Sequence, residues 1–207
     1  MTACCGIEYP VRFAKDMLTL TEAAPGFSDE QLAKARFGDT AALAWLIRAH
    51  QRSVYSLALR MLGSRELAED LTQEVFMQLN GNLKSLASNT HLQFWLRKVT
   101  TYRAIDQLRR RSRVEMTPLD GETPLISTAD GGDPLLQRHL QRLLLELSPP
   151  ARAVLLLRYQ EDLDPMDIAR TLDMPINTVK SHLKRSLETL RQKTPHPEQS
   201  RCEGKST

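Results

Sequence analysis

The sequence predicts an all-α fold, and two observations lead to this prediction. Val, Ile, Tyr and Phe nowhere alternate with polar residues over six positions, whereas Leu, Ala, Arg, Gln and Glu dominate the 207 residues. Apolar side chains instead recur at three- and four-residue spacing, between residues that are typical of helix ends. An apolar content of 41% is enough for small cores. We therefore expect two small helical domains joined by a flexible acidic linker.

Proline and glycine divide the chain into these parts. They occur without apolar periodicity near both ends and in one internal stretch, where regular structure is not expected. The internal stretch also holds five acidic residues and no basic residue. The predicted parts are a disordered N-terminal extension over 1–27, a first domain over 28–113, a linker over 114–133, a second domain over 134–193 and a disordered tail over 194–207.

The first domain is expected to begin with two helices. A capping box at Ser28 and Gln31 starts a short helix that ends near Gly38. Asp39 caps a longer helix, which Gly63 ends in the manner of a glycine in the left-handed conformation. The stripe of this second helix that we expect to be buried consists of Leu43, Leu46, Ile47, Val54, Leu57 and Met61.

Two further helices complete the first domain. Ser64 caps a third helix, which is expected to end near Leu79 because Asn and Gly fill positions 80–82. A loop follows, and a second capping box at Thr90 starts a long helix that runs to about Arg113.

The second domain predicts a helix-turn-helix. Helix starts are indicated by a polar residue followed by proline at Pro134, Pro149 and Pro165. Asp173 and Met174 leave room only for a tight turn before Pro175 opens the last helix. One face of that helix is apolar, and the other face carries Asn177, Thr178, Lys180, Ser181, Lys184 and Arg185. Short polar groups suit base edges and cations suit phosphates, so DNA contact is favoured over an ordinary amphipathic surface helix.

The third and fourth helices carry two further candidate surfaces. Asp70, Gln73 and Glu74 lie opposite the apolar stripe of the third helix, and charge alone favours a solvated face over a protein contact. Residues 97–113 contain seven Lys and Arg against one acid, which is suited to phosphate contacts. Trp95 beside these cations could stack on single-stranded bases, but a core position is favoured for so large an aromatic side chain.

The sequence offers no support for an enzyme. It contains no Gly-rich phosphate loop, and its five His are scattered, so we expect no catalytic residue, metal, cofactor or small-molecule substrate. Cys4, Cys5 and Cys202 form neither a zinc motif nor a disulfide framework. No apolar run reaches the length of a membrane span or of a signal-peptide core, which indicates the cytoplasm. Met17 competes with Met1 as the natural start.

Three segments together carry a family resemblance. GSRELAEDLTQEVF at 63–76, FWLRKVTTYRAIDQLRRRSR at 94–113 and the helix-turn-helix module at 147–191 resemble extracytoplasmic-function (ECF) sigma factors of the sigma-70 family. The resemblance covers residues 28–193 and implies a subunit that gives bacterial RNA polymerase its promoter specificity. Residues 28–113 would then be sigma region 2, and residues 134–193 would be sigma region 4. The acidic linker would run toward the active-site channel of the polymerase.

The resemblance also implies roles for individual residues. The residues that would contact the polymerase clamp helices are Asp70, Gln73, Glu74 and Phe76. The resemblance therefore favours a protein contact for the acidic face of the third helix, where charge alone favoured a solvated face. Contacts with the −10 element fall to the loop and basic helix, at Ser88, Asn89, Thr90, His91, Arg97, Lys98, Arg103, Arg109 and Arg110. Contacts with the −35 element fall to the polar face of the last helix. Leu86, Ala87 and Ser88 stand where the family commonly has an aromatic-Arg-Gly pattern.

The implied partners are core RNA polymerase, through its clamp helices and flap, promoter DNA and an anti-sigma factor. An anti-sigma factor at the inner membrane would hold the protein inactive there, without insertion of the protein itself. The alternative is a stand-alone helix-turn-helix regulator, because response-regulator output domains carry a module similar to 147–183. Residues 64–113 discriminate between the two, since a simple regulator needs no polymerase-binding surface followed by an aromatic-basic helix.

Overall fold

Helices form all the regular structure in the residues that the computed structural model describes, which are 29–114 and 134–193. This confirms the all-α prediction. The helices are α1 (Asp29–Arg36), α2 (Thr40–Leu62), α3 (Arg65–Asn82), a 3-10 turn (Leu83–Ser85), α4 (Asn89–Val114), α5 (Pro134–Glu146), α6 (Pro149–Tyr159), α7 (Pro165–Leu172) and α8 (Ile176–Lys193). The predictions for residues 1–28, for the linker and for the tail, with those for Met17 and the three cysteines, lie outside the described residues.

The ends of α2 follow from local chemistry. The Asp39 carboxylate accepts hydrogen bonds from the backbone N–H groups of Ala41, at 2.8 Å, and Ala42, at 3.1 Å. At the other end Gly63 has φ of 70°, and its N–H donates to the carbonyl oxygen of Leu59. Both bonds use groups that a helix end leaves without a partner. The predicted start and end of this helix are confirmed.

The end predicted for the third helix is wrong. α3 does not stop near Leu79 but continues through Gly81 to Asn82, and a 3-10 turn follows. The turn places Leu83 and Leu86 in the core, where they are 5% and 0% exposed. Burying two leucines is worth more than the roughly 1 kcal/mol that a glycine costs inside a helix.

The capping box predicted at Thr90 is also wrong. α4 begins at Asn89, two residues earlier than a cap at Thr90 implies, and the Ser88 hydroxyl accepts a hydrogen bond from the backbone N–H of His91 at 3.2 Å. Ser88 is therefore the cap of this helix. Its hydroxyl serves the helix in addition to the DNA contact that the family resemblance implies.

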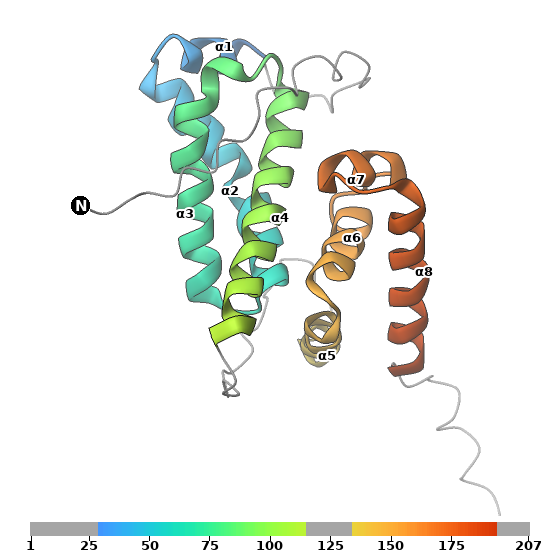
Figure 1. Cartoon of the computed structure of the whole chain (residues 1–207). Coiled ribbons are helices and arrows are strands. Elements are labelled where there is room, and N and C mark those ends of the chain that lie inside the picture. Colours follow the sequence, from blue (N-terminus) through green and yellow to red (C-terminus); the bar gives the residue numbers. More distant parts are fainter. Residues whose placement is uncertain (1–28, 115–133, 194–207) are drawn as a thin grey trace, which may run out of the picture.

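The two groups of helices lie against each other, which the sequence does not predict. α5 and α6 pack against α2, and α6 and α7 pack against α4 (Figure 1). Side chains of the second domain satisfy the last carbonyl groups of α2: Gln141 donates to Arg60 O at 3.4 Å, and Arg152 donates to Met61 O. We call this contact the docking interface.

Candidate polymerase and nucleic-acid interfaces

The first candidate surface is a stripe on α3. Asp70, Gln73 and Glu74 are all exposed, as the helical spacing predicts. Met77 extends the stripe by one turn and is 76% exposed, although the sequence analysis did not single it out. The four residues form what we call the α3 ridge. An exposed methionine beside carboxylates suits a protein partner better than DNA, because phosphates would be repelled.

The opposite side of α3 holds the helix on the core. Ala68, Leu71, Val75 and Leu79 are at most 2% exposed. Phe76, the fourth predicted polymerase contact, is half-buried and packs against this core. Only part of its ring is therefore available to a partner.

The second candidate surface begins with the turn before α4. Ser88, Thr90 and His91 are partly exposed there. The Ala87 N–H donates to Nδ1 of His91 at 3.3 Å, and burial lowers the pKa of this imidazole. Both observations favour the neutral form of His91, because a protonated Nδ1 could not accept.

Asn89 is a correction to the predicted −10 surface. It is only 2% exposed, and its backbone N–H donates to the Asp29 carboxylate at 2.8 Å. Its side-chain amide has no hydrogen-bond partner among the described residues. In this arrangement the Asn89 side chain is not accessible from solvent, as a DNA contact would require.

The cations of α4 divide into two groups. Arg109 and Arg110 are exposed near the end of the helix, where Arg110 makes a surface ion pair with Asp106 at 2.8 Å. Arg97 and Lys98 instead face the docking interface. Arg97 Nε lies 2.9 Å from the Glu161 carboxylate, and the exposed fractions of the two side chains are 26% and 7%. Glu161 belongs to the turn between α6 and α7, so this ion pair joins the two domains.

Lys98, at the docking interface, and Arg103, which belongs to neither group, are both partly exposed. The Lys98 ammonium lies 5.9 Å and 5.7 Å from the ring centres of Phe94 and Tyr102, and burial lowers its pKa. Arg103 Nε is 3.1 Å from the Gln78 amide oxygen when that amide is oriented to accept. Trp95 packs against the core, which agrees with the reading favoured for it over base stacking.

The third candidate surface is α8 in the helix-turn-helix. The Asp164 carboxylate caps α7 by accepting from the N–H groups of Met166 and Asp167, each at 2.8 Å. Asp173 makes the tight turn with φ of 50°. Val179 on α8 is fully buried, and the six predicted DNA contacts all lie exposed on its other face: Asn177, Thr178, Lys180, Ser181, Lys184 and Arg185. The structure thus brings together every −35 residue that the sequence predicts.

Two buried charged residues were missed by the sequence analysis. Glu161 carries no local signal, because its partners on α2 and α4 lie far away in sequence. Arg152 could have been found as the one charged position in the apolar stretch 151–157. Both belong to the docking interface.

Comparisons with known proteins support the resemblance. Residues 46–114 match the family model for sigma-70 region 2, and residues 137–190 match the model for sigma-70 region 4. The ECF RNA polymerase sigma factor SigE of Mycolicibacterium smegmatis is 35% identical over 176 residues, which cover 79% of this chain and 68% of that protein. The chain belongs to the ECF sigma factors. SigW of Bacillus subtilis, another ECF sigma factor, is 29% identical over 78% of this chain and 94% of its own.

Solved structures show the same fold. RpoE of Bartonella quintana, in complex with the anti-sigma factor NepR, matches with a TM-score of 0.61 and 22% identity, over 72% of this chain and 94% of that chain. CnrH in complex with the cytosolic domain of CnrY matches with a TM-score of 0.59 and 17% identity, over 79% and 94% of the two chains. The ECF sigma factor described here directs promoter recognition and transcription initiation by RNA polymerase. A stand-alone regulator would leave its region 2 unexplained.

In residues 29–114 and 134–193, no helix is both long and apolar enough to cross a membrane. No cluster of His, Cys, Asp and Glu in those same ranges could hold a metal ion.

Proposed function

We propose that this sigma factor divides its work among three surfaces. The α3 ridge binds the clamp helices of core RNA polymerase, and α4 with the preceding turn engages the −10 element. The polar face of α8 reads the −35 element, while the second domain also meets the flap. In this role the protein catalyses no reaction itself and acts in the cytoplasm, where its partners are.

The observation that carries the proposal is the chemical contrast between the surfaces of this one protein. The α3 ridge is acidic with one apolar residue, whereas α4 and α8 present cations. A protein that met only DNA would gain nothing from the acidic surface. Run-off transcription with core polymerase on a promoter library tests the proposal. Failure of the purified protein to direct initiation on any promoter would contradict it.

Lys180→Ala and Arg185→Ala test the −35 surface. Both side chains are exposed, so their removal is expected to leave the fold intact. Each substitution should weaken −35 binding by the holoenzyme and reduce the slope of log affinity against log salt by about 1, as loss of one phosphate contact predicts. Glu188→Ala is the matched control on α8. A slope that stays unchanged in both variants would show that neither side chain contacts phosphate.

An anti-sigma factor completes the proposal. Two solved structures of similar fold are complexes of sigma factors with an anti-sigma factor or with a cytosolic domain. We place the corresponding partner of this protein at the inner membrane, where it would hold the sigma factor away from polymerase. Co-purification from membrane and soluble fractions, followed by mass spectrometry, tests this part.

A further inference from the structure

We propose that Ser53 and Arg97 form a site for a backbone phosphate of single-stranded DNA, and that Glu161 occupies this site when the domains are docked. The inference rests on the proposed −10 function of α4. It adds to that function a residue of α2 and an internal competitor for the DNA strand.

The contacts of Glu161 with the first domain are those that a phosphate would make. Its carboxylate accepts from Arg97 Nε at 2.9 Å and from the Ser53 hydroxyl at 3.3 and 3.4 Å. Gln160 Nε2, in the same turn, lies 3.2 Å from Oε1. A guanidinium and a hydroxyl are donors that proteins commonly direct at phosphate oxygens. The carboxylate therefore fills an anion site built by the first domain.

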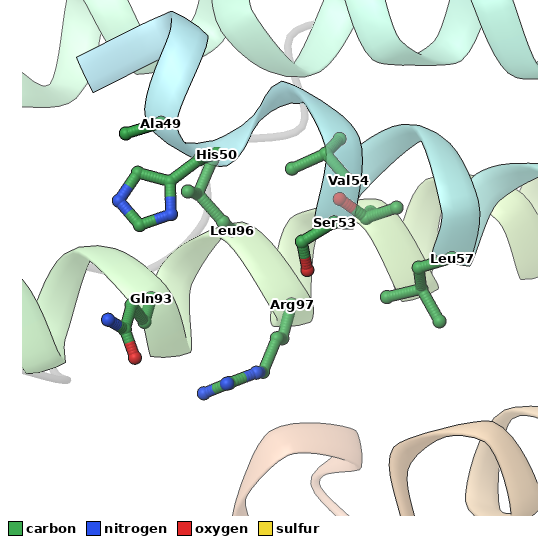
Figure 2. Close-up of a pocket in the computed structure, with 9 residues that line it drawn as sticks. Ala49, His50, Ser53, Val54, Leu57, Gln93, Leu96 and Arg97 are labelled. Carbon is green, nitrogen blue, oxygen red and sulfur yellow. The ribbon is translucent and has the colours of Figure 1, made fainter. Parts of the chain in front are cut away.

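The site lies at the mouth of a groove between α2 and α4. The groove has a volume of about 290 Å³, and Val54, Leu57 and Leu96 contribute to its apolar lining. Figure 2 shows the Ser53 hydroxyl on α2 and the Arg97 side chain on α4, both pointing toward the C-terminal helices. Neither helix alone supplies both donors, so the groove itself defines the site.

Charge across the docking interface supports the same conclusion. Two more acids of the second domain act on the cations of α4. Burial, with Asp164, raises the pKa of Asp167, and Arg170 and Arg97 only partly oppose this rise. Burial lowers the pKa of Lys98, and Asp173 partly opposes this fall. Acids that face the cations of a DNA-binding helix complement it as the phosphates of a DNA strand would.

Docking and strand binding then exclude each other. A strand whose phosphate lies on Ser53 and Arg97 must displace Glu161, and with it the turn that joins α6 to α7. The polar face of α8 stays exposed in the docked form. Docking thus hides part of the −10 surface and leaves the −35 surface open. The apparent affinity for single strands is the affinity of the open form multiplied by the fraction of molecules that are open.

The first experiment uses the full chain without polymerase. Binding of a fluorescent single-stranded oligonucleotide is measured by anisotropy, and the radius of gyration by small-angle X-ray scattering. If about one molecule in ten is open, Glu161→Gln should tighten binding by up to about tenfold and increase the radius. The control is Glu146→Gln, which removes an equal charge from a carboxylate paired with Lys193 inside the second domain. Equal effects of the two variants would overturn the competition.

The second experiment uses the holoenzyme on promoter DNA with a single-stranded −10 region. Ser53→Ala and Arg97→Gln should each weaken binding by about fivefold, the usual value of one hydrogen bond, and Ser56→Ala one turn away should not. Arg109→Gln, outside the docking interface, tests the −10 function by itself. If only Arg109→Gln weakens binding, the phosphate site is overturned and the −10 function stands. If none of these variants weakens binding, the −10 function of α4 falls, and the inference falls with it.

Discussion

Replacing Asp70, Gln73 and Glu74 together with alanine is expected to abolish stable binding to core RNA polymerase. The three side chains are exposed and follow one face of α3, so no buried contact is lost and the helical fold should persist. Truncation of a hot-spot residue costs more than about 1 kcal/mol, so three hot spots on the α3 ridge correspond to at least about 100-fold in affinity. Co-purification and titration with core polymerase measure the loss, and circular dichroism verifies the fold.

A control with the same change of charge decides whether the position of the carboxylates matters. Glu30→Ala combined with Asp106→Ala also removes two exposed carboxylates from the first domain. Each of them pairs with one surface cation, Lys34 at 2.7 Å and Arg110 at 2.8 Å, and such pairs contribute little to stability. This variant should bind polymerase like the wild type. Retention of polymerase by the ridge variant would remove the α3 ridge from the proposal.

Features fixed by neighbouring residues could be predicted from the sequence. Asp39, Ser64 and Asp164 cap their helices as expected. A cap needs only a short polar side chain that accepts a hydrogen bond from the backbone N–H two or three residues later in the chain. The exposed face of α8 follows in the same way from helical spacing. Both are properties of a single segment, so no knowledge of its surroundings is needed.

Features fixed by distant residues could not be predicted. The third helix passes Gly81 because Leu83 and Leu86 are buried by other helices, which no local pattern reveals. Arg97 was predicted as a −10 contact, but its ion pair with Glu161, 64 residues away, could not be predicted from any local pattern. The contact between Glu161 and Arg97 is therefore a property of the docked domains rather than of α4 alone.

Loss of Arg152 should destabilise the protein strongly. Its guanidinium, on a residue that is 4% exposed, donates to the carbonyl oxygens of Leu144 at 2.8 Å, Leu145 at 2.7 Å and Leu147 at 3.1 Å, and also to that of Met61. Burial lowers its pKa to about 10, so it remains charged at neutral pH. One side chain thus donates hydrogen bonds to backbone carbonyl groups at the end of α5, in the following turn and at the end of α2.

Arg152→Ala is expected to lower the free energy of unfolding by about 3 kcal/mol, because several buried carbonyl groups lose their donor at once. Three of the four acceptors belong to the second domain, so that domain should unfold first. Both tryptophans, Trp45 and Trp95, lie in the first domain, and their fluorescence reports on it alone. In a urea titration, Arg152→Ala should therefore shift the far-UV circular dichroism transition more than the fluorescence transition. The control is Arg142→Ala, at an exposed position, which should change the free energy from either transition by no more than about 0.5 kcal/mol. Equal shifts in the two signals would instead mean that the docked domains unfold as one unit, and no shift in either would mean that water replaces the guanidinium without cost.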